Sequence, residues 1–137
     1  MLRWLIAALL IAVPAQAVEV TWPLRDPIAY DGDTLYVEIP GIPSEIRRVS
    51  IRVLGVDTPE IRGKCEAEKA LARQARDLVR SIFAGARSVR IDLQGWGKYG
   101  GRVLAIVYTP DGRDLADVLI EARLGRAYDG GKRQGWC

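Results

Sequence analysis

The sequence predicts an α+β domain, mainly β, in which the elements follow the order β-β-β-α-β-β-α. Short runs of alternating apolar residues, separated by turns rich in Gly, Pro and Asp, predict three consecutive strands. A long amphipathic stretch then predicts a helix, and two more alternating runs and a short helix follow it. Five strands interrupted by a helix after the third suit a small closed barrel of the OB type.

The first three strands form a predicted meander. Ile28 to Tyr30 and Thr34 to Ile39 flank Asp31-Gly32, and Asp-Gly between apolar runs is a strong hairpin signal. After a turn rich in Pro and Gly, the alternation of apolar and polar residues predicts a third strand from Ile46 to Val56. The preceding arm, Val18 to Arg25, is expected to be irregular.

The main helix is predicted from Cys65 to Ala84. Apolar residues at helical spacing form one stripe along it, namely Ala67, Leu71, Ala75, Leu78 and Ile82. Strands four and five are predicted at Ser88 to Leu93 and at Arg102 to Tyr108, on either side of a Gly-rich loop.

A second, short helix is predicted near the C-terminus. Asp114 is its expected N-cap residue, and the helix runs to about Leu124. From Gly125 onward the chain is rich in Gly and Arg, so we expect it to be irregular.

Residues 1–17 form a predicted secretory signal peptide. Arg3 supplies the positive start, Trp4 to Val13 is almost wholly apolar, and Ala15-Gln16-Ala17 matches a cleavage site. We therefore expect a secreted or periplasmic protein that starts at about Val18 and is not held at the membrane after cleavage. Residues 18–137 have the size of one domain.

Composition excludes several kinds of catalysis. The chain contains no histidine, which rules out Ser-His-Asp and Cys-His mechanisms and zinc sites with histidine ligands. Catalysis would have to use carboxylates, Arg, Lys, Tyr or a hard metal ion. The net charge of +3 permits a nucleic-acid partner but does not require one.

The two cysteines, Cys65 and Cys137, favour a disulfide because an even count is typical of exported proteins. It would tie the last residue to the start of the main helix and add about 4 kcal/mol of stability in the chain-entropy model. The alternative is a pair of unbonded thiols.

Acidic residues gather at two strand ends. Asp57 and Glu60 flank the stiff Thr58-Pro59 turn, and Arg52 lies five residues before Asp57. Asp33 follows the first hairpin turn. If Asp33 and Asp57 converge, two carboxylates and a backbone carbonyl suit a hard cation such as Ca²⁺. The alternative is that these acids are merely solvated turn residues.

The Gly-rich loop contains a third group of polar residues, Lys98-Tyr99-Gly100-Gly101-Arg102. Glycines let backbone approach a ligand, Lys and Arg bind phosphate, and Tyr stacks or donates a hydrogen bond. The alternative is an ordinary hairpin connection.

Together these pieces resemble the staphylococcal nuclease (thermonuclease) family, whose fold is a five-stranded OB barrel with added helices. The likeness covers about Ile28 to Tyr128. Three motifs occur in the family's order: Asp31-Gly32-Asp33-Thr34, Arg52 through Asp57-Thr58-Pro59-Glu60, and Lys98 to Arg102. The chain departs from the family by the extra Gly101 and by a short loop between Glu60 and the helix.

The resemblance implies calcium-dependent hydrolysis of phosphodiester bonds in DNA and RNA. Ca²⁺ would be bound by Asp33, Asp57 and the Thr58 carbonyl. The products would carry a 3′-phosphate, because the 5′-oxygen is released.

The resemblance also implies roles for the remaining residues. Glu60 would act as general base on the attacking water, and Arg52 and Arg102 would bind the phosphate and stabilise its developing charge. Lys98 and Tyr99 match positions that contact a terminal phosphate.

Two other readings remain open. An OB barrel can bind single strands or another partner without cleaving them. A structural domain with vestigial motifs is the third possibility. The complete set of acids and arginines favours the nuclease, because a pure binding site gains nothing from carboxylates that repel phosphate. We expect a monomer that acts on single-stranded or unpaired nucleic acid.

Overall fold

The structure is a computed structural model that describes residue 12 and residues 16–137. The predicted signal peptide lies almost wholly outside the described residues. Within the part of the chain that is described, no helix is both long and apolar enough to cross a bilayer.

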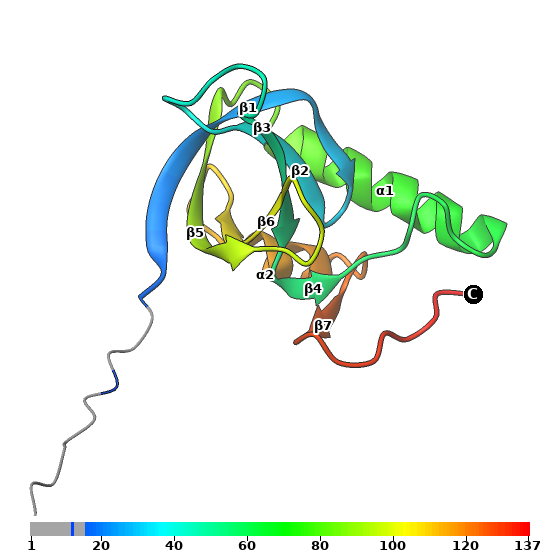
Figure 1. Cartoon of the computed structure of the whole chain (residues 1–137). Helices are drawn as coiled ribbons and strands as arrows, with labels where there is room; N and C mark the ends of the chain where they lie inside the picture. The colour runs from blue at the N-terminus through cyan, green and yellow to red at the C-terminus, as the bar shows by residue number, and fades with distance from the viewer. Residues whose placement is uncertain (1–11, 13–15) are drawn as a thin grey trace, which may run out of the picture.

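Five strands close into a barrel, which confirms the predicted fold class (Figure 1). The barrel strands are β1 Val18–Asp31, β2 Thr34–Glu38, β3 Arg48–Val53, β5 Ser88–Trp96 and β6 Arg102–Tyr108. Their order around the barrel is β1-β2-β3-β6-β5, and β1 pairs with β5 to close it. The β3–β6 pair is parallel, and the other pairs are antiparallel.

Four further elements lie outside the barrel. They are β4 Gly55–Asp57, α1 Glu66–Ile82, α2 Leu115–Glu121 and β7 Arg126–Tyr128. The long α1 packs against β1, whereas α2 packs against β4, β6 and β7 (Figure 1). The order of the predicted elements is therefore observed, with two short strands added.

The expectation that Val18 to Arg25 is irregular is wrong. This stretch is the first half of β1 and pairs with β5 from Val18 opposite Leu93 to Pro23 opposite Ser88. Trp22 is buried in the core. The segment becomes a strand because closing the barrel requires a partner for β5.

The predicted strand from Ile46 to Val56 is interrupted, and the tail from Gly125, predicted to be irregular, contains the short strand β7. At Leu54 the chain leaves β3, and Gly55 takes a left-handed φ of +87°. The chain continues as β4, which pairs with β7 from Gly55 opposite Tyr128 to Asp57 opposite Arg126. The break lets residues before and after it face the same site.

The core is formed by apolar side chains that alternate into the barrel, closed by residues of the helices. Its largest fully buried members are Leu35, Val37, Ile51, Val53, Val56, Val79, Phe83, Val89, Ile91, Val107, Leu115 and Leu119.

The buried face of α1 follows the predicted stripe in its C-terminal half, where Leu78 and Ile82 pack against the core, and departs from it near the start of the helix. Ala75 is buried as expected, but Ala67 is exposed, and Ala72 and Val79 are the other buried apolar residues of the helix. Glu68 is buried beside them because its carboxylate accepts hydrogen bonds from the preceding loop. Glu68 therefore takes an inward position that an apolar stripe does not predict.

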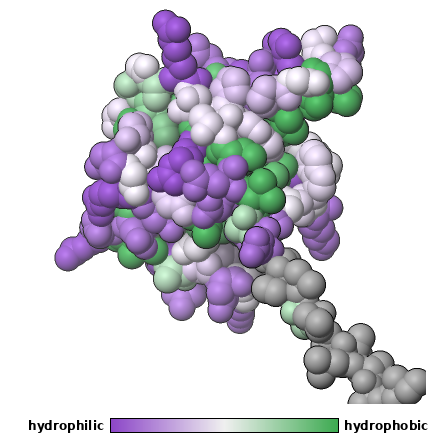
Figure 2. All heavy atoms as spheres, turned by 90° about the vertical axis from the view of Figure 1, so that its left-hand side faces the viewer, coloured by the Kyte–Doolittle hydropathy of each residue, from purple (hydrophilic) through white to green (hydrophobic). Residues whose placement is uncertain are grey.

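On the face viewed in Figure 2, which is the left-hand side of Figure 1, hydrophilic residues surround small hydrophobic patches. Trp96 at the end of β5 is among the exposed large apolar residues of the described chain.

Gly32 lies where the first hairpin meets the rest of the fold, so Gly32→Ala should destabilise the protein. A Cβ there would lie 2.8 Å from Thr58 Cγ2 and 2.9 Å from Ala75 Cβ. Overpacking of this kind costs about 1–3 kcal/mol. Urea unfolding measures the loss, and Gly100→Ala, with nothing within 4 Å of its Cβ, is the matched control. Equal stability of both variants would contradict this close packing.

Candidate active site

Asp33 joins the first hairpin to the turn after β4. Its Oδ2 accepts hydrogen bonds from the Thr58 backbone N–H at 3.1 Å and from Thr58 Oγ1 at 2.9 Å. The Asp33 side chain is buried. A buried carboxylate is stable only when donors or cations compensate it, so this contact holds the predicted ligands Asp33 and Thr58 side by side.

Arg52 lies beside both aspartates. Its Nη1 is 3.2 Å from Asp33 Oδ2, and its Nη2 is 3.9 Å from Asp57 Oδ1. Nη1 also donates to the carbonyls of Val53 at 2.8 Å and Val56 at 3.0 Å. The guanidinium thus spans the break between β3 and β4. Strict alternation along one strand would have placed Arg52 and Asp57 on opposite faces, and the break removes that obstacle.

Asp57 has a carboxylate oxygen that fits a cation. Oδ1 is buried and accepts no hydrogen bond among the described residues. Arg133 Nη2 lies 2.7 Å from Oδ1 and Arg52 Nη2 lies 3.9 Å from it, so two guanidinium groups offset its charge. A buried carboxylate oxygen near a second aspartate is the kind of ligand that a hard cation takes.

Glu60 lies at the rim of the acidic group with its side chain partly exposed. Its Oε1 accepts a hydrogen bond from Arg133 Nη2 at 2.7 Å. Its backbone N–H donates to Glu68 Oε1 at 3.3 Å, which ties the short loop after Glu60 to the start of α1. The carboxylate is therefore beside the aspartates and reachable by solvent.

Asp31 is a buried acid that sequence reasoning placed in a turn motif but not in the site. Its Oδ1 accepts a hydrogen bond from the Asp33 backbone N–H at 3.1 Å. Burial, together with the nearby charges of Asp33 and Glu60, raises the pKa of Asp31 to about 8. Burial and the neighbouring acids therefore disfavour a negative charge on Asp31.

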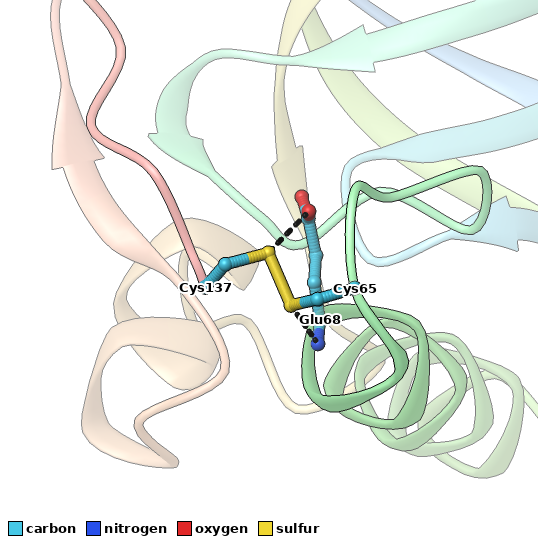
Figure 3. A group of neighbouring side chains, drawn as sticks. All are labelled: Cys65, Glu68 and Cys137. Atoms are coloured by element: carbon cyan, nitrogen blue, oxygen red, sulfur yellow. Dashed lines mark hydrogen bonds between the residues drawn. A yellow bond between two sulfur atoms is a disulfide. The ribbon is translucent and has the colours of Figure 1, made fainter.

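The described residues contain one compact group of three potential metal-ligating side chains, and it is not the predicted one. Cys65, Glu68 and Cys137 have ligand atoms within 4.8 Å of one another. Both sulfurs are consumed in a disulfide, so they cannot bind a metal as thiolates (Figure 3). The predicted acids Asp33, Asp57 and Glu60 do not form such a group among the described residues.

A pocket beside the acids is lined by basic and aromatic side chains. They come from the β3–β4 break, the Gly-rich loop and the segment after β7, and include Arg52, Lys98, Tyr99, Arg102, Tyr128 and Arg133. The structure thus places the predicted substrate-binding residues in the same pocket as Arg52. Cations with tyrosines suit a phosphate chain carrying bases.

The extra Gly101 does not remove Arg102 from this pocket. Gly101 takes a left-handed φ of +76°, and its carbonyl accepts a hydrogen bond from the Ser50 N–H at 2.9 Å. The turn therefore absorbs the added residue, and Arg102 begins β6 opposite Ser50 in the parallel pair with β3.

Comparison with known proteins agrees with this geometry. Residues 50–134 match the model of the family described as "Staphylococcal nuclease homologue". The chain belongs to the staphylococcal nuclease family. Nucleases of this family generally depend on a metal ion and act on nucleic acids.

A protein of Escherichia coli named "Uncharacterized endonuclease" is 28% identical to this chain over 99 residues. The match covers 72% of this chain and 56% of that protein, so the chain spans about half the length of its relative. The family and this relative support nuclease activity in general for the staphylococcal nuclease homologue described here.

The predicted Cys65–Cys137 disulfide is confirmed, with the two Cα atoms 6.0 Å apart. Cys65 is also the N-cap residue of α1, and its Sγ accepts from the Glu68 N–H at 3.4 Å. Glu68 in turn accepts from the Lys64 N–H at 2.8 Å and lies 3.7 Å from Cys137 Sγ (Figure 3). One buried carboxylate therefore organises the helix start, the loop after Glu60 and the end of the chain.

Sequence reasoning missed Arg133 and Trp136, which the disulfide brings to the acids. Trp136 Nε1 donates to Asp57 Oδ2 at 3.4 Å, and Arg133 contacts Asp57 and Glu60. Both residues are among the last five of the chain, and the predicted disulfide would hold that end near Glu60. This was the signal that could have identified them.

Removing the disulfide should lower the free energy of unfolding by about 4 kcal/mol, because it closes a loop of 72 residues. Urea unfolding of Cys65→Ser/Cys137→Ser against the oxidised protein measures this loss. The oxidised protein should lose a similar amount in dithiothreitol, whereas the double variant should not respond. A reductant effect on the double variant would mean that another process is being measured.

Proposed function

We propose that this family member is a calcium-dependent endonuclease that hydrolyses phosphodiester bonds in DNA and RNA. The observation that carries the proposal is the position of Arg52. It contacts two buried aspartates on one side and lines a pocket with Arg102 and Lys98 on the other. A cation site next to a phosphate-binding pocket is the arrangement that metal-assisted hydrolysis requires.

Asp33, Asp57 and the Thr58 carbonyl would hold the ion. The buried carboxylates of Asp33 and Asp57 favour an oxygen-binding cation such as Ca²⁺, as does a sequence that has no histidine and whose two cysteines form a disulfide. When bound, calcium supplies positive charge that polarises the phosphoryl group.

Glu60 is proposed as the general base. Its carboxylate lies at the solvent side of the aspartates, where an attacking water has access. Water oxygen forms the new bond to phosphorus, the bond from phosphorus to the 5′-oxygen breaks, and Glu60 takes the proton of the water. A proton returns to the 5′-oxygen, which leaves a 3′-phosphate on the other product.

Arg52 and Arg102 are proposed to bind the reacting phosphate. Forked guanidinium donors match phosphate oxygens and stabilise the charge that grows as the five-coordinate phosphorus forms. Lys98 and Tyr99 lie in the same pocket and are proposed to contact a neighbouring or terminal phosphate. The exposed ring of Tyr99 also suits unpaired bases, which supports single-stranded nucleic acid as substrate.

A module that binds single strands without cleaving them is the alternative. The basic pocket alone would serve such a function. The alternative does not account for the two aspartates beside the pocket, because a site that only binds phosphate gains nothing from carboxylates, whose charge repels it. We also propose that the protein is exported and monomeric; the disulfide supports an oxidising compartment.

The first test is digestion of single-stranded DNA by the oxidised protein, with Ca²⁺ or with a chelator. Cleavage should require Ca²⁺, and Arg52→Ala should reduce it by about 10²–10³-fold, the usual loss for one transition-state donor. Arg48→Ala, on the same strand but paired with Glu38 at the surface, is the matched control. Binding without cleavage by folded wild-type protein would favour the alternative.

Replacing Glu60 by Gln should lower turnover far more than it weakens nucleotide binding. Loss of a general base typically costs about 10²–10⁴-fold in rate, while the amide keeps the size of the side chain. Initial rates and equilibrium binding of a short single strand give the two effects. Glu45→Gln, an exposed acid of the β2–β3 turn, controls for the lost charge. Equal losses in rate and binding would contradict the assignment of Glu60.

A further inference from the structure

The last eight residues form a C-terminal strap, Gly130–Cys137, that runs from β7 toward the start of α1 (Figure 1). Its Arg133 contacts Asp57 and Glu60. The disulfide anchors one end of the strap to the start of α1. At the other end, Tyr128 Oη donates to the Gly131 carbonyl at 2.9 Å. A strap held at both ends presents its middle residues in a defined position.

Arg126 also holds the strap through contacts with Gly135 and Trp136. Its Nη1 donates to the Gly135 carbonyl at 2.8 Å, and its guanidinium lies 3.8 Å from the centre of the Trp136 ring. Trp136 itself contacts Asp57 through Nε1. The strap is therefore packed onto the site by stacking and hydrogen bonds in addition to the disulfide.

The strap brings one cation, Arg133, to the acids. A single nitrogen, Nη2, lies 2.7 Å from both Asp57 Oδ1 and Glu60 Oε1. An arginine side chain is a permanent cation, and this one lies next to the proposed base.

Arg133 retains donors that point to a second partner. Among the described residues, only Nη2 makes a hydrogen bond, so Nε and Nη1 remain available. The side chain is 43% exposed and lines the pocket that also contains Arg52, Lys98 and Arg102. Within that pocket lining, Asp129 is the one acid. Four cations around one cavity fit a phosphate chain better than a structural ion pair alone.

We propose that Arg133 is a third arginine of the substrate site, which binds a phosphate in this pocket, and that the Cys65–Cys137 disulfide positions it. This inference rests on the proposed nuclease function. Nη2 orients the guanidinium on Glu60 and Asp57, while the free donors face the substrate. The end of the chain then belongs to the active site, although it is remote in sequence from the other site residues.

A competing interpretation predicts the opposite effect of removing the Arg133 side chain. Arg133 could act as a counter-ion that occupies Asp57 and Glu60 and so competes with the metal. Removing the side chain would then tighten Ca²⁺ binding and raise activity. The exposure of the side chain and its place in the pocket with Lys98 and Arg102 favour the phosphate role.

The test measures binding of fluorescein-labelled oligothymidylate by anisotropy in a chelator, which prevents calcium-dependent cleavage, over a range of salt concentrations. Arg133→Gln should weaken binding roughly five-fold at 0.1 M salt and lower the slope of log K against log salt by about 0.7, the value for one phosphate contact on a single strand. Arg113→Gln, which loses an exposed arginine paired with Glu121, should leave the slope unchanged.

The salt dependence of binding also tests whether the disulfide positions Arg133. Cys65→Ser/Cys137→Ser should lose the same phosphate contact, and combining it with Arg133→Gln should produce no further change in slope. A disulfide that only stabilises the fold would lower the unfolding midpoint but leave the slope of the folded protein unchanged.

Calcium titration by calorimetry separates the two interpretations without measuring activity. An unchanged or weaker Ca²⁺ affinity in Arg133→Gln, together with the smaller slope, supports the inference. Tighter Ca²⁺ binding or an unchanged slope overturns it, while wild-type cleavage would still support the nuclease. If the folded wild-type protein neither binds nor cleaves the strand, the proposed function fails first and the inference fails with it.

Discussion

The site depends on the placement of the Arg52 guanidinium between two buried carboxylates. Asp33 and Asp57 repel each other at the end of the barrel, and a buried charge is costly unless a partner compensates it. Arg52 compensates both and also donates to the carbonyls of Val53 and Val56. The same side chain therefore neutralises the acids and fixes the β3–β4 break that brings them together.

Glu68 performs a comparable task for the outer half of the site. Its carboxylate receives the backbone N–H groups of Glu60 and Lys64 and lies against the sulfur of Cys137. The loop after Glu60 is short, so these contacts leave the proposed base little freedom. The barrel thus supplies the buried acids, whereas α1 and the disulfide determine the position of Glu60 and of the C-terminal strap.

Local sequence patterns predicted the elements that depend on interactions between residues close in the sequence. Asp31-Gly32 marked the hairpin, and Asp114 caps α2 by accepting from the Ala116 N–H at 2.8 Å. The first half of β1 and the short β7 were missed, because each is a strand only through a partner far along the chain. The stripe of α1 was predicted correctly at Ala75, Leu78 and Ile82, but the burial of Glu68 was missed because it depends on hydrogen bonds that no apolar stripe reveals.

The sequence by itself determined the chemistry available to this protein. Without histidine, and with Arg52, Asp57, Glu60 and Arg102 at the family's spacing, it indicated a nuclease that uses carboxylates, arginines and a hard cation. Only the tertiary structure decided that the end of the chain reaches this site. Arg133 lies 73 residues from Glu60 in the sequence, and their hydrogen bond exists because the barrel, the β4–β7 pair and the disulfide bring both ends of that segment to one place.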